Sequence, residues 1–253
     1  MTVGEPDGKA VQARDELLAR GGCIAVVGSV PRAAYRRFAQ HRSIASIKQG
    51  LYALAGTARP DAWTDADSTD RLGTVTLSTD QLSPVRSASA KQKGTVEIEN
   101  FERDHIERFD DDTAFIDRVD AKVREVVDIC NVGDSNPPEL TIYSLGVLVE
   151  EAGWDEMVCN IIDWRRELVE VGGTLFVHID RPAHSPLFVE NQELFDAYVE
   201  LAEVEKRFST GTDVVTKARW HIASLGRDSS APVGVSGDWR PLDDYSVVDR
   251  REK

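Results

Sequence analysis

Short apolar runs alternate with amphipathic stretches along this chain, and turn-forming residues separate them. Apolar runs of about 4–8 residues bounded by turns predict buried strands, whereas apolar residues repeating at helical spacing predict helices. The predicted strands span residues 23–27, 51–54, 74–77, 96–98, 140–145, 174–179, 213–216 and 219–222. The predicted helices span residues 10–20, 32–41, 112–130, 154–171 and 191–204, with a turn or helix at 147–153.

The pattern is clearest between residues 154 and 180. Ile162 is expected on the apolar face of the helix at 154–171, and Phe176 lies in the most apolar strand, so both are predicted core residues. Asp180 follows the end of that strand. Because open α/β sheets bind ligands at the carboxyl ends of their strands, Asp180 is the best candidate for a polar site residue outside the core.

Strands that alternate with helices long enough for crossovers predict a mostly parallel sheet covered on both faces. The fold class is therefore α/β, a three-layer α/β/α arrangement, with the last two strands as antiparallel edge strands. We expect one domain at 11–225, a disordered lead at 1–10 and a polar, loosely ordered tail at 226–253.

Charge narrows the range of partners. The formal net charge is −14, which argues against binding to nucleic acid or an anionic membrane surface, because phosphate neutralisation dominates such affinity. The chain has 25 Asp and 19 Glu against 22 Arg and 8 Lys. Such Asp-rich, Lys-poor surfaces suit high salt, so we expect a salt-adapted archaeal source. A polar, acidic start and the lack of any long apolar run predict a cytoplasmic protein with no membrane span.

No metal site is predicted. The three cysteines form no C-x-x-C or C-x-x-H pair. His178, Asp180 and His184 offer two imidazoles and a carboxylate, but His178 alternates with apolar neighbours in a strand, and Pro182 intervenes before His184. A structural histidine and a loop histidine are therefore the preferred interpretation. The run at 110–112 lacks the glycine and terminal Glu of a calcium loop.

The turn after the first strand lies where nucleotide-binding proteins carry a phosphate loop. That loop needs G-x-x-x-x-G-K-[ST], in which glycines free backbone amides, Lys reaches the phosphates and Ser/Thr holds Mg²⁺. Here the same window reads Gly28-Ser29-Val30-Pro31-Arg32-Ala33-Ala34-Tyr35. Pro31 also removes one amide donor. The strand-turn-helix pattern is present, whereas the Gly-Lys-Ser/Thr residues are absent from this window.

The order of the elements after this window is a second feature that characterises the chain. The first strand and its turn are followed by a mid-chain strand preceded by Pro137-Pro138 and by a long helix ending in Gly172-Gly173. Next come a strand beginning GGTLFVHIDR and two edge strands. In this order the chain resembles RecA/KaiC-type ATPase domains. In particular it resembles the degenerate RecA-like proteins of haloarchaea, often found near chemotaxis, transducer and archaellum genes. The resemblance covers residues 17–225.

The resemblance implies a nucleotide site that has lost its chemistry. In working members the mid-chain strand ends in an acid that orients Mg²⁺, commonly followed by Ser. Tyr143 stands at that place here, followed by Ser144, and no counterpart of the catalytic Glu can be assigned. The degenerate site positions are Gly28, Ser29, Pro31, Arg32, Tyr143 and Ser144.

The resemblance therefore implies a protein without catalytic residues or a cofactor, although nucleotide binding without hydrolysis stays open. The expected role is regulatory or scaffolding, in signalling or motility, through a protein partner or self-association.

Other chemistries remain as alternatives. An S-adenosylmethionine-dependent methyltransferase, or another small-molecule enzyme on an α/β fold, is favoured by the late strand after Gly172-Gly173. It is disfavoured by the single Gly28 after the first strand. Arg32, Arg36 and Arg37 are candidates for an anion at a helix start, or for a solvated face. Neither Ser29 nor Ser144 lies in a G-x-S-x-G nucleophile elbow.

Overall fold

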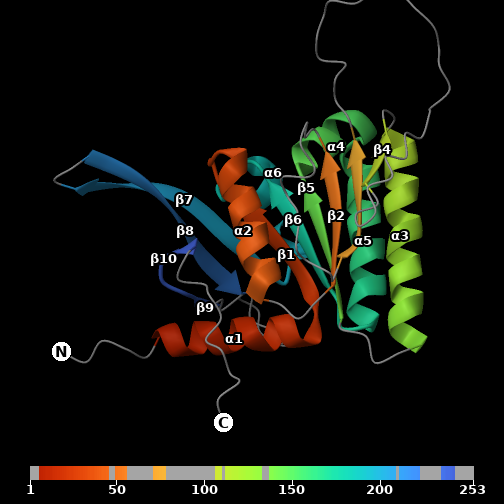
Figure 1. Ribbon diagram of the computed structural model, residues 1–253, viewed down its shortest axis with the longest axis horizontal. Helices are drawn as coiled ribbons and strands as arrows, with labels where there is room; N and C mark the ends of the chain where they lie inside the picture. Colours follow the sequence, from red (N-terminus) through yellow and green to blue (C-terminus); the bar gives the residue numbers. More distant parts are fainter. Residues whose placement is uncertain are drawn as a thin grey trace, which may run out of the picture.

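The computed structural model describes residues 6–45, 49–55, 71–77, 106–109, 112–132, 137–208, 211–222 and 235–242. One sheet runs through the molecule, with helices on both faces (Figure 1). This is the predicted α/β class with a three-layer α/β/α arrangement, and the prediction is confirmed.

The elements follow the predicted alternation of strands and helices. The strands are β1 (Gly22–Val27), β2 (Gln49–Ala55), β3 (Arg71–Leu77), β4 (Ile106–Phe109), β5 (Pro138–Tyr143), β6 (Thr174–Ile179), β7 (Ala197–Phe208), β8 (Gly211–Ile222), β9 (Val235–Ser236) and β10 (Arg240–Pro241). The helices are α1 (Pro6–Arg20), α2 (Arg32–Ala45), α3 (Asp112–Val132), α4 (Leu145–Ala152), α5 (Trp154–Glu170), α6 (Pro186–Val189) and the 3₁₀ turn η3 (Gln192–Leu194).

The sheet is parallel except at one edge. Its strand order is β10-β8-β7-β1-β6-β5-β2-β3-β4, with β9 also paired to β8. All pairs from β7 to β4 are parallel, and β8 is antiparallel to β7. β7 and β8 form a long ribbon that projects to the left in Figure 1. The antiparallel strands therefore lie on one side only, as predicted.

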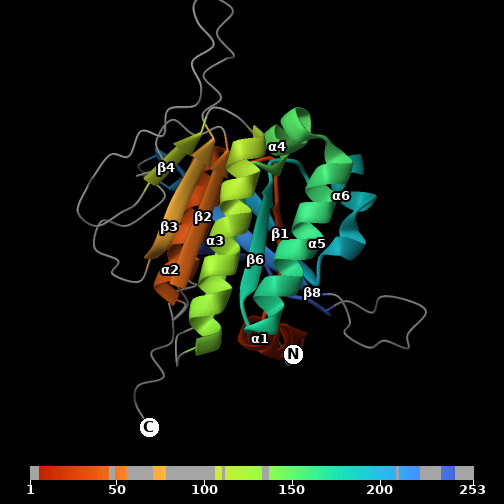
Figure 2. The ribbon, with the colours of Figure 1, turned by 90° about the vertical axis from the view of Figure 1, so that its right-hand side faces the viewer.

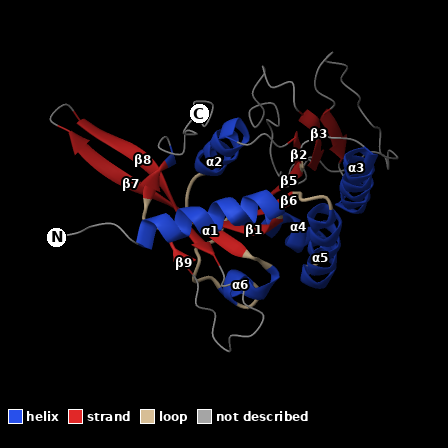
Figure 3. Ribbon diagram, turned by 90° about the horizontal axis from the view of Figure 1, so that it is seen from below, coloured by secondary structure: helices blue, strands red, loops and turns tan. Residues whose placement is uncertain are grey.

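Each face of the sheet has its own apolar cluster. On one face, α3, α4 and α5 cover residues such as Leu140, Leu175 and Val177 (Figure 2). On the other, α1 and α2 cover residues such as Ile24 and Phe176. Figure 3 shows α2 on one side of the sheet and α4 and α5 on the other. The layered architecture thus follows from strands that are apolar on both faces.

Of the two predicted core residues, one in β6 and one in α5, only the first is buried. Phe176 on the neighbouring strand is fully buried, as predicted. The prediction for Ile162 is wrong, because this residue is 45% exposed. The buried residues of this helix are Met157, Ile161, Trp164 and Leu168. Their spacing defines a narrower stripe than the one drawn from the sequence, and Ile162 lies one residue, about 100°, away from it.

The prediction of a helix at 191–204 is also wrong. Those residues form η3 and then the first part of β7. Their apolar positions fit two patterns, because Leu194, Tyr198 and Leu201 have helical spacing while Ala197, Val199 and Leu201 alternate. Parallel pairing with β1 buries the alternating set, so a long-range contact decides between the two.

The ends of the chain carry more structure than predicted. Residues 6–10 of the expected disordered lead belong to α1. Part of the expected loose tail joins the sheet as β9 and β10, and Leu242 after them is only 1% exposed. The two strands expected at 213–216 and 219–222 are one strand, β8, and the strand expected at 140–145 lies at Pro138–Tyr143. The strand expected at 96–98 falls outside the described residues, while β4 was not predicted.

Within the part of the chain that the structure describes, no helix combines the length and the apolar character needed to cross a membrane.

Candidate functional site

Three turns meet at the carboxyl edge of the parallel strands. β1 leads into Gly28, β5 into Ser144 and β6 into Asp180. Because β6 pairs with both β1 and β5, these turns are neighbours, near the end of the sheet where α4 begins (Figure 1). The structure therefore brings together the turns that carry Gly28, Ser144 and Asp180, at the edge where α/β sheets place ligands.

Gly28 is fixed between two strands. Its buried N–H donates to the carbonyl oxygen of Arg181 at 2.8 Å. A Cβ at Gly28 would lie 2.6 Å from the carbonyl oxygen of Leu201 on β7, closer than side-chain carbons approach backbone. The glycine is therefore required here for the close approach of two backbones, whether or not a phosphate is bound.

The rest of the turn is short and directed to solvent. Ser29, Pro31 and Arg32 are exposed. The helix α2 starts at Arg32, and the N–H of Ala34 donates to the carbonyl oxygen of Pro31 at 2.8 Å. The carbonyl of Pro31 thus begins the hydrogen-bond ladder of α2, and Pro31 itself has no N–H to offer a ligand.

Tyr35 occupies the centre of this edge. Its hydroxyl lies 2.6 Å from the carbonyl oxygen of Gly28 and 2.8 Å from that of Ile179, and the side chain is 1% exposed. The single hydroxyl proton is donated to one of these acceptors at a time. Burial, and then the nearby carboxylate of Asp180, raise the pKa of Tyr35, so the phenol stays neutral. Tyr35 therefore ties the glycine turn to the end of β6.

The position of Tyr35 within the window matters. In a phosphate loop the last three residues are Gly, Lys and Ser/Thr, and here they are Ala33, Ala34 and Tyr35. At the Lys position stands the buried Ala34, which has no charged group. At the Ser/Thr position stands Tyr35, with an aromatic ring in place of a small hydroxyl side chain. No role for Tyr35 was predicted from the sequence. Its place at the Ser/Thr position was the available signal.

Tyr143 supplies a second neutral phenol. It ends β5 with 1% exposure, and burial raises its pKa to about 12, with Arg32 lowering and Asp180 raising it to smaller extents. Its ring meets that of Tyr35 edge-on at 6.1 Å. A protonated phenol carries no charge for a hard cation, so Tyr143 cannot replace the acid of a magnesium site at neutral pH.

His178 is enclosed by aromatic rings. It is fully buried, with ring centres at 5.4 Å from Tyr35, 6.0 Å from Tyr143 and 6.4 Å from Phe38. His184, its predicted metal-binding companion, is exposed on the turn before α6. Among the described residues, no cluster of His, Cys, Asp and Glu could hold a metal. The structure thus places His178 in a packed aromatic cluster with Tyr35, Phe38 and Tyr143.

Ser144 has an unusual backbone. It is buried, with φ 61° and ψ 65°, and is the one non-glycine residue of the described chain with positive φ. It precedes α4 without a side-chain cap, while its carbonyl accepts from the N–H of Val147 at 3.1 Å. Such outliers concentrate at ligand sites and switches, so the turn after β5 still has a site-like geometry.

Asp180 lies against the start of α4. Its side chain is 41% exposed, and its Oδ2 is 3.9 Å from Nη1 of Arg181. The other oxygen, Oδ1, is enclosed and accepts no hydrogen bond. A Cβ at Gly146 would lie 3.0 Å from it. A carboxylate beside a helix N-terminus is favourable, so the macrodipole of α4 accounts for this placement without a ligand.

Taken together, the edge is filled rather than hollow. Two neutral phenols, a buried imidazole and a packed phenylalanine occupy the region between the turns after β1, β5 and β6. The exposed charges at the rim are Arg32, Asp180 and Arg181. The sequence located the turns correctly, but it did not predict the aromatic cluster, because that requires side chains from two strands and one helix.

Comparison with known proteins adds a family and no function. A model described as "Family of unknown function (DUF7504)" matches residues 21–201. The match includes the glycine turn, Tyr35, Tyr143 and Asp180. No curated protein matches the chain.

Proposed function

Because the chain belongs to the DUF7504 family, whose function is unknown, we propose from its geometry that it is a non-hydrolysing RecA/KaiC-like domain with a regulatory or scaffolding role. The observation that carries the proposal is the hydroxyl of Tyr35, which bonds at the end of β1 and the end of β6. A phosphate loop carries a small hydroxyl at this position to hold Mg²⁺, whereas this chain carries a tyrosine whose hydroxyl bonds to its own backbone.

The charge balance at this edge supports the same conclusion. Phosphoryl transfer needs cations and a bound metal where negative charge develops. Here the buried positions carry Ala34, Tyr35 and Tyr143, none of which is charged at neutral pH. Among the described residues, the charged side chains near this edge include Arg32 and Asp180, and both act electrostatically on Tyr143. The absence of charged groups at these buried positions supports a non-hydrolysing role.

The strand order favours this reading over the methyltransferase. A methyltransferase would carry an antiparallel strand inserted between parallel strands near the sheet edge. In this sheet β7 pairs in parallel with β1, and antiparallel β8 lies outside it. A parallel sheet with its antiparallel strands at one edge is what the RecA/KaiC resemblance implies. The setting in haloarchaeal signalling or motility, and a cytoplasmic location, rest on that resemblance and on the acidic composition.

Phosphate release from ATP tests the central claim. The protein is incubated with Mg²⁺ and ATP in multi-molar KCl, and released phosphate is compared with a protein-free blank. We expect no difference. Turnover that is abolished by Tyr143→Phe or Arg32→Ala would overturn the proposal, because it would show that these positions support catalysis. Turnover unaffected by both changes would place hydrolysis at another site and overturn the non-hydrolysing role.

Purification from a salt-adapted host tests the regulatory role. We expect a defined protein partner, or a second copy of the chain, to stay bound in high salt. Recovery of S-adenosylmethionine or its demethylated product in the purified protein would instead support the methyltransferase. Binding of that cofactor, measured by titration calorimetry against an ATP control, distinguishes the two.

A further inference from the structure

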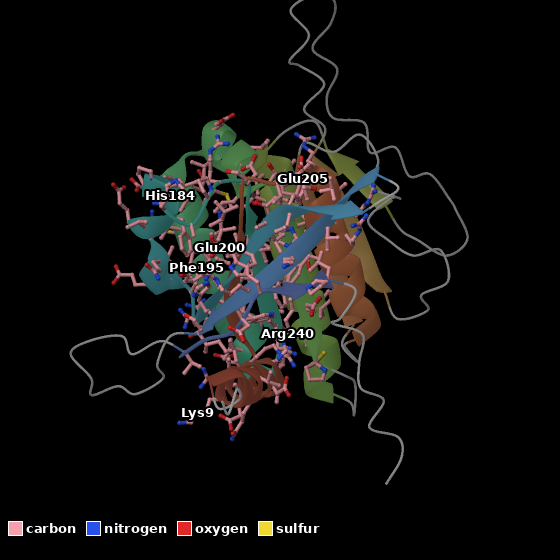
Figure 4. The ribbon with its side chains drawn as sticks, turned by 90° about the vertical axis from the view of Figure 1, so that its left-hand side faces the viewer. Lys9, His184, Phe195, Glu200, Glu205 and Arg240 are labelled. Carbon is pink, nitrogen blue, oxygen red and sulfur yellow. The ribbon has the colours of Figure 1, made fainter. Side chains whose placement is uncertain are left out.

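A second group of polar side chains lies on the β7–β8 ribbon, of which β7 pairs directly with β1. Tyr198 and Glu200 on β7 are paired with His221 and Arg219 on β8. Paired residues of an antiparallel ribbon share a face. The intervening residue Trp220 is buried in the cluster under α1 and α2, so this group occupies the opposite face. Figure 4 views the molecule from the side of the ribbon and labels Glu200.

Strand β9 brings a serine to this face. Ser236 is paired directly with His221 across the β8–β9 ladder. The Oγ atom of Ser236 lies 2.9 Å from Nδ1 of His221, and Ser236 is exposed to solvent. A hydroxyl that bonds to an imidazole and remains accessible has the first two features of an activated nucleophile.

The imidazole is held in place from two further sides. The ring of His221 stacks on that of Tyr198, with centres 4.3 Å apart and planes 8° from parallel. Its Nε2 lies 3.4 Å from Oε2 of Glu200 without forming a hydrogen bond. Catalytic hydrogen bonds are often long or poorly aligned before substrate binds. Glu200 is anchored in turn by Nη2 of Arg219 at 2.6 Å.

The protonation state suits a base. Burial, and then the positive charge of Arg219, lower the pKa of His221, while Glu200 opposes the shift. The ring is therefore neutral at pH 7. When Nδ1 accepts the hydroxyl proton of Ser236, the single ring hydrogen is on Nε2, whose distance from Oε2 of Glu200 is 3.4 Å. This arrangement is the one that lets a histidine take a proton from serine.

We propose that Ser236 is a nucleophile, that His221 is its general base, and that this face transfers the acyl group of small carboxylic esters to water. A serine–histidine contact between paired strands is common by itself. Two features distinguish the contact between Ser236 and His221 from such pairs. A third group, Glu200, lies on the far side of the imidazole ring, and Ser236 is exposed. The three side chains follow one another in the spatial order of a Ser-His-Glu triad, which is defined by geometry and not by chain order, and we infer that the His221–Glu200 hydrogen bond forms when substrate binds. Glu200 acts through His221 and is a positioning residue.

The reaction balances with water as the co-reactant. Oγ of Ser236 forms a bond to the ester carbonyl carbon while its proton passes to Nδ1 of His221. The bond from that carbon to the alcohol oxygen then breaks, and His221 returns the proton to the departing alcohol. Water, deprotonated by His221, attacks the acyl-serine, releasing the carboxylic acid and restoring Ser236.

Labelling with an alkyl fluorophosphonate tests the nucleophile directly. In this reagent the phosphorus–fluorine bond breaks as the serine oxygen bonds to phosphorus, and fluoride leaves. The full chain is treated in high salt, and the adduct is located by mass spectrometry. Cleavage after Arg227 places Ser229, Ser230 and Ser236 in one tryptic peptide, so the first two serve as internal controls.

We expect a single adduct on Ser236, and none on that peptide in Ser236→Ala. His221→Asn should slow labelling about 100-fold or more, since general bases contribute roughly 10²–10⁴-fold. Glu200→Gln should move the midpoint of the pH–rate profile to lower pH, because the carboxylate favours the protonated ring. Circular dichroism melts show that each variant is folded. Hydrolysis of 4-nitrophenyl acetate should follow the same order.

Three results would overturn the proposal. One is the absence of an adduct on Ser236 in folded wild-type protein. Another is equal labelling of Ser229 and Ser230, which marks general surface reactivity. The third is a labelling rate on Ser236 that His221→Asn leaves unchanged.

Discussion

At the scale of single residues, the candidate site replaces charge with aromatic packing. Tyr35 and Tyr143 are buried phenols with raised pKa values, so both are neutral donors or acceptors at pH 7. The one hydroxyl proton of Tyr35 is shared between two backbone carbonyls at the ends of neighbouring strands. Removing this hydroxyl would leave the two acceptors without their donor. Tyr35 therefore has a structural role that does not depend on any ligand.

Core position, not hydrophobicity alone, sets the cost of truncation. Phe176 is fully buried and Ile162 is 45% exposed, although both were predicted in the core. We expect Phe176→Ala to cost about 3–5 kcal/mol through lost burial and a cavity. Ile162→Ala, the matched surface control, should change stability by less than about 0.5 kcal/mol. Chemical denaturation measures both, and a costly Ile162→Ala would show that this face of α5 is covered.

At the scale of elements, the junction of β1 with its neighbours controls the site. β1 is held between β6 and β7, both parallel to it. The chain leaves β1 at Gly28, where the backbones of β7 and of the turn after β6 are both close. The turn is therefore fixed by sheet packing before any chemistry is considered.

Replacing Gly28 by Ala tests that junction. The added Cβ would lie 2.6 Å from the carbonyl oxygen of Leu201, so strand β7 or the turn must shift. We expect a loss of about 1–3 kcal/mol, the usual cost of overpacking. Gly8→Ala is the control, because a Cβ in α1 there meets nothing within 4 Å. It should stabilise the protein by up to about 0.5–1 kcal/mol. Urea titrations compare the two, and equal midpoints would contradict the packing argument.

At the scale of the whole molecule, net charge opposes folding at low salt. The chain carries 44 acidic against 30 basic residues, a net charge of −14. Self-repulsion of this size destabilises a compact state, and salt screens it. The Debye length falls from about 10 Å at 0.1 M to about 3 Å at 1 M ionic strength.

We therefore expect the melting midpoint to rise from 0.1 M to multi-molar KCl, followed by circular dichroism. Potassium glutamate at equal ionic strength separates screening from anion-specific effects. A midpoint that salt leaves unchanged or lowers would remove the argument for adaptation to high salt.

Much of the fold could be predicted because its signals are local. Buried strands such as β1 and β6, the long helices α3 and α5 and the glycine turn at Gly28 each follow from a short apolar pattern. The absence of Gly-Lys-Ser/Thr from the window after β1 was equally local, and so was Tyr143 at the end of β5. These features depend on residues within one turn or strand of each other, where propensity and burial agree.

Tertiary structure decided the rest, since it joins residues that are far apart in the chain. Pairing of β7 with β1, more than 170 residues away, made a strand of a segment with helical spacing. Packing of α5 placed Ile161 inside and Ile162 outside. The aromatic cluster around His178 draws on β5, β6 and α2. Ser236 met His221 only because a short strand from the expected tail joined the sheet. One-dimensional patterns cannot encode such contacts, because each depends on which distant partner buries or bonds a side chain.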